Sequence, residues 1–343
     1  MSAVTISPKS SMSGEEGGGS WLVVAAAFFV QFIICGISYS LGIFHVVFQD
    51  VFAHNHFDTS WVGSIQLCIG FGLALTPSIM IVEQHFHEAR VEALSIVSGG
   101  IGVGIITFPV VIRHLLDYLS WRGTLLILSG VAFHMVIFGA VMKPAPKKKP
   151  LHLMPLLSFL PLRHPIFHGM CIANLFWSFG STVIYMYLPA YSIEKGIDFY
   201  TSTFLISCIG MASFTARMIF AFMGHNSALD DVTAISCSIC LGVVLTGVSP
   251  LLFKDFAGQI GYALLFGFYS GYWTIFLSQV SRELIGPEYV AMGNGFLSFM
   301  IAVGSLLGGP AAVWRSVSSL QLKVDTDSSS LWKELKNSCI IMP

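Results

Sequence analysis

The chain has 343 residues, of which 55% are hydrophobic and only 10% are charged, and its formal net charge is −1. Soluble proteins carry about 25% charged residues, so this composition excludes a water-soluble fold. The near balance of charge also gives no indication of nucleic acid or of an acidic substrate as a partner.

The chain begins with a Ser/Gly-rich stretch, residues 1–20, which we expect to be a flexible cytoplasmic tail. The next run, 21–44, is apolar, is long enough to cross a bilayer and has no small-residue cleavage site after a short core. It therefore predicts a spanning helix rather than a signal peptide. The requirement for about 20 apolar residues per span predicts eight further helices. These are 62–82, 93–112, 123–142, 166–189, 200–223, 232–253, 256–280 and 289–313.

Charged residues lie almost entirely in the tails, in the loops and at the edges of these runs. Among the 17 Lys/Arg and 18 Asp/Glu residues, only Arg217 falls well inside a predicted span. Hydrocarbon cannot hydrogen-bond free backbone groups, so each span must be helical. The sequence therefore predicts an all-α membrane protein with about nine transmembrane helices.

The segment 143–165 between the fourth and fifth spans is basic and rich in proline. Its lysines predict a cytoplasmic location, which also places the N-terminus inside and the polar tail, 314–343, outside. A contact of the lysine run with lipid headgroups or with a partner is the alternative. The cysteines and histidines, including Cys237 and Cys240 one helical turn apart, form no convincing metal site, and we expect neither a metal nor a cofactor.

The expected organisation is a four-span bundle at 21–142, the basic linker at 143–165 and a five-span bundle at 166–313. Two bundles divided by a long linker suggest the two halves of a transporter. Composition alone does not distinguish a transporter from a channel or a receptor. No motif of an intramembrane enzyme is present, so we do not expect an enzyme.

Several stretches of the chain resemble, in order, one family of carriers. They are EEGGGSWLVVAAAFFVQFIICGISYSLGIF, VEQHFHEARVEALSIVSGGIGVG, LSWRGTLLILSGVAFHMVIFGAVMKP, YLPAYSIEKG, FTARMIFAFMG, LFGFYSGYW and VSRELIGPEYVAMGNGFLSFMIAVGSLLGGP. The chain is similar to the monocarboxylate transporters, the solute carrier 16 type within the major facilitator superfamily. The resemblance implies a two-bundle fold, transport of small organic anions by alternating access, a plasma-membrane location and single-span chaperone glycoproteins as partners.

The chain departs from the twelve-helix pattern of that family in two places. SWVGSIQ, which resembles the start of the second helix, runs straight into LCIGFGLALTPSIMIVE, which resembles the fourth, so about two helices are missing near Gln66 and Leu67. After Pro310 the sequence leaves the family pattern, and the twelfth helix is expected to be absent. An alternative transcript or an imperfect gene model would explain both departures. A shortened chain retained in the endoplasmic reticulum is the alternative to a plasma-membrane location.

Arg217 is the strongest candidate for a substrate-binding residue. A charge near the membrane midplane costs at least about 2.5–3.5 kcal/mol and usually lines a polar pathway. A guanidinium also matches a carboxylate in a bidentate pair. The alternative is an arginine whose side chain reaches the cytoplasmic interface near Met223. The resemblance favours the first interpretation, because the family places an arginine in this helix.

Proton coupling is doubtful, because two positions differ from the proton-coupled members of the family. Ser213 stands where they carry an aspartate, and Ile43 stands where they carry a lysine. Facilitated or differently coupled transport is therefore expected. Ser213 remains a candidate for gating or coupling, as does Arg90, whose alternative role is that of an exposed loop arginine that sets topology.

Weaker candidates for substrate contact match the cavity-lining positions that the resemblance implies. These are Tyr39, Tyr185, Ser270 and Thr274, with interhelical or own-backbone hydrogen bonds as the alternative for the hydroxyls. Asn174 and Trp177 are further candidates, with helix packing as their alternative. The glycines of SGGIGVG are expected to allow close helix packing, because they lie in an apolar span without a following lysine.

Three functional hypotheses remain. The first is a transporter for small organic anions such as monocarboxylates, with Arg217 as the binding charge. The second is an inactive or regulatory shortened form that binds the full-length carrier or its chaperone glycoprotein. The third is an unrelated channel or receptor.

Overall fold

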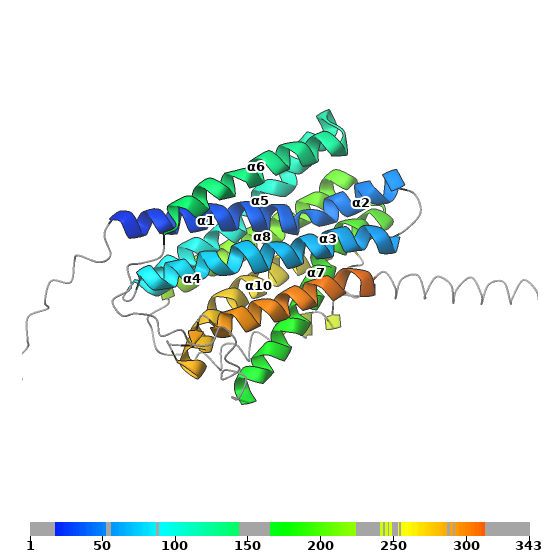
Figure 1. Cartoon of the computed structure of the whole chain (residues 1–343). Helices are drawn as coiled ribbons and strands as arrows, with labels where there is room; N and C mark the ends of the chain where they lie inside the picture. The colour runs from blue at the N-terminus through cyan, green and yellow to red at the C-terminus, as the bar shows by residue number, and fades with distance from the viewer. Residues whose placement is uncertain are drawn as a thin grey trace, which may run out of the picture.

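The computed structural model describes residues 18–52, 56–86, 89–143, 165–223, 241–242, 244–245, 247–248, 253, 255–286, 289–290 and 292–312. All regular structure in these ranges is helical. The helices, shown in Figure 1, are α1 (Gly18–Tyr39), α2 (Leu41–Phe52), α3 (His56–Gly70), η1 (Phe71–Leu75), α4 (Thr76–His85), α5 (Arg90–Tyr118), α6 (Trp121–Val141), α7 (Pro165–Glu194), α8 (Phe199–Met223), α10 (Phe256–Ile285) and the helix Met292–Ala312.

Seven of the predicted spans coincide with helical segments that are long and apolar enough to cross a membrane. They are Gly19–Phe48, Thr59–His85, Arg90–Tyr118, Trp121–Val141, Pro165–Glu194, Phe199–Ile219 and Met292–Ala312. The predicted span 256–280 coincides with α10, whose 30 residues extend about 45 Å. Four predicted segments fall largely or wholly outside the described residues. These are most of 232–253, most of the linker 143–165, most of the tail 1–20 and all of the tail 314–343. The all-α membrane fold is therefore confirmed.

The first span is interrupted once, at Ser40, which separates α1 from α2. The Ser40 hydroxyl donates a hydrogen bond to the Gly36 carbonyl oxygen at 2.7 Å. Glycine and serine one turn apart are a usual cause of a helix break, because the glycine is flexible and the hydroxyl competes for a backbone acceptor. The break lies directly after Tyr39, a candidate site residue.

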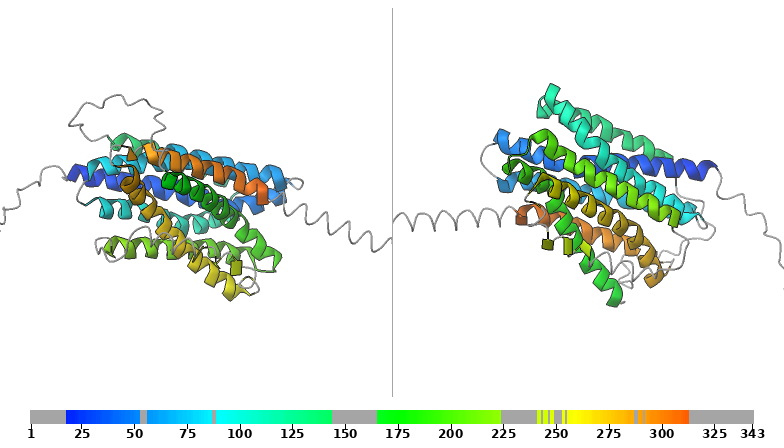
Figure 2. Two further views of the ribbon diagram at one scale, coloured as in Figure 1. Left: turned by 90° about the horizontal axis from the view of Figure 1, so that it is seen from below. Right: turned by 180° about the vertical axis from the view of Figure 1, so that it is seen from behind.

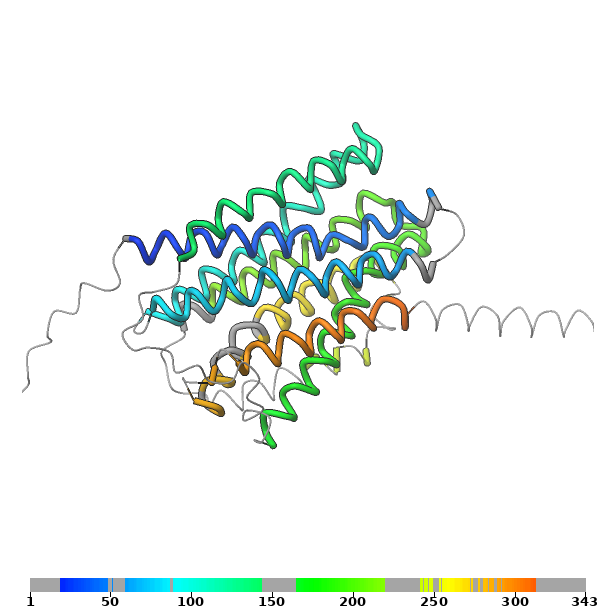
Figure 3. The backbone as a smooth tube through the Cα atoms, viewed as in Figure 1, coloured from blue at the N-terminus to red at the C-terminus, as the bar shows by residue number. Residues whose placement is uncertain are grey.

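The second span is continuous through Gln66 and Leu67, where two helices are expected to be missing. Figure 3 shows α3, η1 and α4 following one another as a single rod. The widened turn η1 comes just before Pro77, which has no N–H for the usual helical bond. The Thr76 N–H and hydroxyl both bond the Phe71 carbonyl oxygen, which satisfies the backbone inside the bilayer.

Helix α5 belongs to the first half of the chain and packs closely on α1 of that half and on α8 of the second half. A Cβ atom at Gly100 or Gly104 would collide with α1 at the carbonyl oxygens of Phe28 and Phe32. A Cβ at Gly102 would come within 2.7 Å of Phe214 in α8. The prediction that these glycines serve helix packing is confirmed. Figure 2 shows, from two further directions, the helices of the bundle lying side by side.

Helix α6 is the least buried span. Only 11% of its most apolar window is buried, against 33–61% for the other candidate spans. In Figure 1 it lies along one edge of the molecule, and it packs mainly on α1. Leu126, Phe133 and Val136 on its outer face are between 62% and 74% exposed, which suits a helix that faces lipid.

Candidate functional site

Arg217 is buried in the interior of the helix bundle. Its side chain is 2% exposed, and one guanidinium nitrogen donates hydrogen bonds to the Ser213 carbonyl oxygen at 3.1 Å and to the Ser213 hydroxyl. These contacts turn the side chain back by one helical turn, away from the nearer end of α8 at Met223. The geometry is that of an interior charge rather than one that reaches the membrane surface.

The structure brings Arg217 together with three of the other predicted substrate residues. Tyr39 and Tyr185 lie within electrostatic range of the guanidinium. Their rings are 4.1 Å apart between centroids, and this contact joins the end of α1 to α7. Ser270 of α10 forms a side-chain hydrogen bond with Tyr185. A cation and three hydroxyl-bearing side chains from four helices therefore form one cluster, the Arg217 cluster.

Close crossing of two helices holds this cluster in place. A Cβ at Gly271 would lie 2.6 Å from the Ser213 carbonyl oxygen and 3.0 Å from the Ala216 Cβ. Only a glycine allows α10 to approach α8 this closely, so Ser270 is brought to the level of Ser213 and Arg217. The Ser270 hydroxyl also donates to the Gly267 carbonyl oxygen at 2.9 Å, which is the own-backbone bond considered above as its alternative role.

A cavity lies beside the cluster and encloses about 970 Å³ of empty space, including its open mouth. Its apolar wall contains Phe71, Leu75, Ile79, Ile101, Leu277, Leu297 and Ile301. Its polar wall contains Gln31, Thr76, Ser98, Ser178, Ser181, Thr182, Asn294 and Ser298. A largely apolar space with a few convergent polar groups is typical of a small-molecule site.

Two tryptophans and Tyr39 complete the lining. The rings of Trp177 and Trp273 stack with 6.0 Å between centroids and 17° between planes. Trp273 Nε1 donates a hydrogen bond to Asn174 Oδ1 at 3.1 Å, which fixes the orientation of the indole. Asn174 is fully buried and supports Trp273 from behind the wall of the cavity.

Tyr39 belongs to both the cavity and the Arg217 cluster, whereas Arg217 itself is not part of the cavity wall. The Tyr39 ring contacts Phe71 on the cavity side, at 5.8 Å between centroids, and Tyr185 on the cluster side. In this conformation the aromatic pair therefore separates the open space from the guanidinium.

The cavity lies at the middle of the bundle and extends toward one end of it. Its lining residues belong to the middle of α7, to the second half of α1 and of α10, to η1 and the first turn of α4, and to the first half of α5 and of the helix Met292–Ala312. By the orientation expected from the sequence, the end toward which it extends is the cytoplasmic one.

The opposite end of the molecule is tightly packed. A Cβ at Gly42 would collide with the Tyr185 carbonyl oxygen, and one at Gly309 would collide with the Ser64 hydroxyl. Tyr187 donates a hydrogen bond to the Gly309 carbonyl oxygen at 3.0 Å and bonds the side chain of Ser60. We call this contact of α2, α3, α7 and the helix Met292–Ala312 the outer junction.

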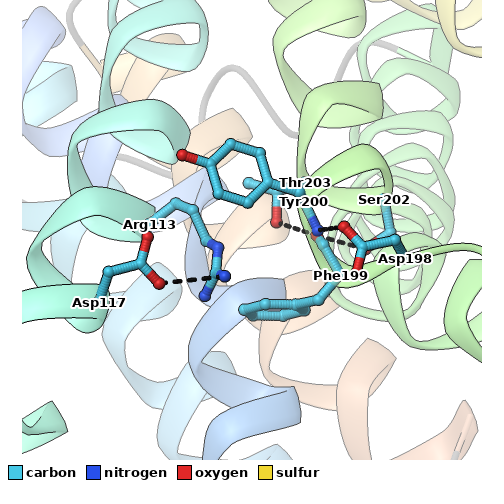
Figure 4. Close-up of polar contacts among 7 residues, drawn as sticks. All are labelled: Arg113, Asp117, Asp198, Phe199, Tyr200, Ser202 and Thr203. Atoms are coloured by element: carbon cyan, nitrogen blue, oxygen red, sulfur yellow. Dashed lines mark hydrogen bonds and ion pairs between the residues drawn. The ribbon is translucent and has the colours of Figure 1, made fainter.

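A second contact closes the same end between α5 and α8. Figure 4 shows the Arg113 guanidinium between the rings of Phe199 and Tyr200, with Asp117 beside it. The guanidinium carbon is 4.6 Å and 4.9 Å from the two ring centroids, and Arg113 Nη2 is 3.0 Å from Asp117 Oδ1. Asp198 accepts a hydrogen bond from the Tyr200 N–H at 2.9 Å, which caps the start of α8.

The remaining predicted residues lie apart from the cluster or outside the described part. Arg90 lies in the first turn of α5 and is 8% exposed, so it is not the exposed loop arginine of the alternative interpretation. Its role in gating or coupling stays a prediction. The side chain of Thr274 lies outside the described part of the chain.

Sequence reasoning missed most of the polar wall of the cavity. Ser181 and Thr182 follow Ser178 by three and four residues on α7, so both lie on the same face of the helix as Ser178. Such a row of hydroxyls on one face of an apolar span can be recognised in the sequence and predicts a polar lining. Gln31, alone on α1, gives no such pattern, although its side chain is fully buried and donates to Ser78 at 3.4 Å.

Known proteins match the chain over most of its length. The Major Facilitator Superfamily profile matches residues 24–309. Monocarboxylate transporter 12 of Xenopus laevis is 23% identical in an alignment that covers 87% of this chain and 83% of that protein. Monocarboxylate transporter 13 of Bos taurus is 24% identical, with 86% and 82% covered. Monocarboxylate transporter 6 of Mus musculus is also 24% identical, with 87% and 69% covered.

Proposed function

The chain belongs to the major facilitator superfamily, and from this premise we propose that it carries small organic anions, such as monocarboxylates, by alternating access. The observation that carries the proposal is the arrangement of a buried arginine and three hydroxyl-bearing side chains beside a cavity at the middle of the bundle. The names of the similar proteins agree with this class of substrate.

Arg217 supplies the charge that a carboxylate needs. Held by Ser213, its guanidinium presents fixed donors at low exposure, where a charge-assisted bond is stronger than in water. The hydroxyls of Tyr39, Tyr185 and Ser270 supply neutral donors for the second carboxylate oxygen. The apolar wall and the two tryptophans suit the organic part of the substrate.

Alternating access requires that the two ends of the site open in turn. Here the cavity extends from the middle of the bundle toward the expected cytoplasmic end and the outer junction is packed, which is the arrangement expected of an inward-facing state. The contact of Tyr39 with Tyr185 joins the two halves of the chain at the level of Arg217. Separation of this pair would connect the cavity with the guanidinium.

The proposal is tested by uptake of a panel of labelled monocarboxylates into oocytes that express the chain, with surface expression quantified. Arg217→Ala is expected to abolish uptake at equal surface level, and Arg217→Lys to retain part of it because the charge remains. Arg122→Ala, which removes an exposed arginine at the start of α6, is the matched control and is expected to retain uptake. Uptake that is equal in Arg217→Ala and in the unsubstituted chain would contradict the assigned role.

A second candidate function is favoured by the weak burial of α6. A span with only 11% of its apolar window buried offers a long face to lipid or to another helix. A shortened form that binds the full-length carrier or a single-span chaperone glycoprotein would use such a face. Co-purification with the carrier, without uptake by the chain alone, is the result that this function predicts.

A further inference from the structure

Gln31 is a buried amide in the wall of the cavity. It lies in α1 within the first membrane span, and its side chain is fully buried. The function proposed above uses Arg217 and three hydroxyl-bearing side chains but gives this amide no part. Burial of an amide in an apolar span is costly unless its oxygen and its nitrogen are both hydrogen-bonded, so any atom left without a partner calls for an explanation.

Ser78 of α4 decides which end of the Gln31 amide is left without a partner. The Ser78 hydroxyl donates its hydrogen to the Leu75 carbonyl oxygen at 2.7 Å, so toward the amide it can only accept. Gln31 Nε2 accordingly donates to Ser78 Oγ at 3.4 Å. This leaves Gln31 Oε1, for which the described part of the chain offers no donor within hydrogen-bond distance. A buried acceptor in the cavity wall is therefore free for a ligand.

Other polar groups of the wall also offer acceptors. The Ser98 hydroxyl donates to the Ser95 carbonyl oxygen at 3.0 Å. On α7, the Ser181 hydroxyl donates to the Ser178 carbonyl oxygen at 3.1 Å. A hydroxyl whose hydrogen is already bonded presents only its lone pairs to a ligand. The described residues that line the cavity are all uncharged, so an ammonium or a second carboxylate would find no counter-charge there. The polar wall suits a neutral donor.

The distance from Gln31 to the Arg217 cluster sets the length of a ligand that contacts both. Cys35 and Tyr39 follow Gln31 on α1 by four and eight residues, and both lie within electrostatic range of the guanidinium. These spacings correspond to about 6 Å and 12 Å along the helix axis. The six bonds between the carboxyl carbon and the hydroxyl oxygen of 6-hydroxyhexanoate span about 7 Å, and a hydrogen bond at each end adds about 2.9 Å. A molecule of this length can reach both groups.

We propose that Gln31 selects elongated monocarboxylates that carry a neutral hydrogen-bond donor, a hydroxyl or an amide N–H, at the end remote from the carboxylate. The inference rests on the function proposed above, in which Arg217 binds the carboxylate once Tyr39 and Tyr185 separate. Gln31 Oε1 accepts the hydrogen bond of the remote donor. The apolar wall and the two tryptophans contact the chain between the two ends.

The test compares 6-hydroxyhexanoate with heptanoate, which has a methyl group in place of the hydroxyl. Affinity is measured as the rise in the thermal unfolding midpoint of the purified full chain with ligand concentration, which does not depend on transport. A neutral hydrogen bond contributes about two- to tenfold in affinity, so we expect 6-hydroxyhexanoate to bind more tightly by at least about threefold. 6-Aminohexanoate, whose ammonium would lack a counter-charge, is expected to bind more weakly than 6-hydroxyhexanoate.

Variants of Gln31 assign the preference to its oxygen. Gln31→Leu removes the acceptor, so the ligand hydroxyl would lose its hydration without gaining a partner, and heptanoate should bind at least as tightly as 6-hydroxyhexanoate. Gln31→Met is a second replacement in case Gln31→Leu does not fold. Ser207→Ala is the matched control and is expected to retain the preference. It removes another buried hydroxyl, which donates from α8 to the Ile106 carbonyl oxygen at 3.2 Å, outside the cavity wall.

A positional isomer tests where the donor must lie. 2-Hydroxyhexanoate has the same composition as 6-hydroxyhexanoate, but its hydroxyl lies beside the carboxylate and stays at the Arg217 cluster. Gln31→Leu should therefore weaken the binding of the 6-isomer and leave that of the 2-isomer unchanged. Equal losses for the two isomers would overturn the assignment of a remote donor.

The remaining outcomes separate this proposal from the proposed function. Heptanoate that binds the unsubstituted chain as tightly as 6-hydroxyhexanoate overturns the role of Gln31, as does a preference that survives both replacements. The proposed function stands in both cases if Arg217→Ala abolishes binding of the two ligands. Tighter binding of 6-aminohexanoate overturns the neutral donor. Stabilisation by none of the ligands contradicts both proposals. The predicted preference without accumulation in liposomes would support the role of Gln31 and contradict transport alone.

Discussion

Replacement of Gly104 by alanine tests the close packing of α5 on α1 within the first half of the chain. Gly104 lies on the face of α5 that crosses α1. The added Cβ would collide with the Phe32 carbonyl oxygen and would lie 3.0 Å from the backbone nitrogen and 3.2 Å from the Cα of Gly36. All three atoms belong to the backbone of a helix, so none of them can move aside by rotation of a side chain.

The magnitude follows from two opposing effects. Overpacking of a well-packed interior costs about 1–3 kcal/mol, and alanine in place of glycine in a helix interior stabilises by about 0.5–1 kcal/mol. At Gly104 the first effect is larger, so we expect a net loss of about 0.5–2 kcal/mol. At Gly130 in α6 a Cβ meets nothing within 4 Å, so only the second effect operates. The two substitutions should therefore differ in sign.

The assay is the temperature at which half of the detergent-solubilised protein is lost from the monodisperse peak in fluorescence-detected size-exclusion chromatography. We expect this temperature to fall for Gly104→Ala and to stay the same or rise for Gly130→Ala. Equal midpoints for Gly104→Ala and the unsubstituted chain would refute the close contact of α5 with α1.

Two further pairs of substitutions test one contact at the outer end of α5 and one contact at the cavity wall. Arg113→Gln removes an i,i+4 ion pair and two cation–π contacts, so it should cost about 1–2 kcal/mol, whereas Asp117→Asn should cost less than about 0.5 kcal/mol. Equal losses in the same thermal assay would show that the ion pair, rather than the aromatic rings, holds Arg113. Trp273→Phe keeps an aromatic ring in the cavity but leaves the buried Asn174 carbonyl oxygen without its donor, at a cost of about 1–3 kcal/mol. Recovery of the lost stability in Trp273→Phe with Asn174→Leu would confirm this cause, and no recovery would contradict it.

The positions of the membrane helices could be predicted from the sequence, because the apolar requirement of the bilayer acts on each span separately. The run 93–112 illustrates both the success and its limit. It lies wholly within α5, but the helix extends to Tyr118, and Arg113 and Asp117 pair with each other within this extension. A charged residue ends an apolar run without ending a helix.

The site was predictable only in part. Arg217 is predicted from its charge inside an apolar span, and Tyr39, Tyr185 and Ser270 are predicted from the resemblance. The structure places all four in one cluster. The separation of Arg217 from the cavity by Tyr39 depends on how α1 and α7 meet, which no local pattern encodes.

The central claim is that these 343 residues transport an organic anion by themselves. The most direct measurement is uptake of a labelled monocarboxylate panel into liposomes that contain only the purified chain, preloaded with the same unlabelled anion so that exchange drives accumulation. We expect accumulation of at least one anion, and none in liposomes that contain Arg217→Ala at equal protein content. The absence of accumulation for every anion, from protein that elutes as a single folded peak, would contradict the claim and favour the regulatory function.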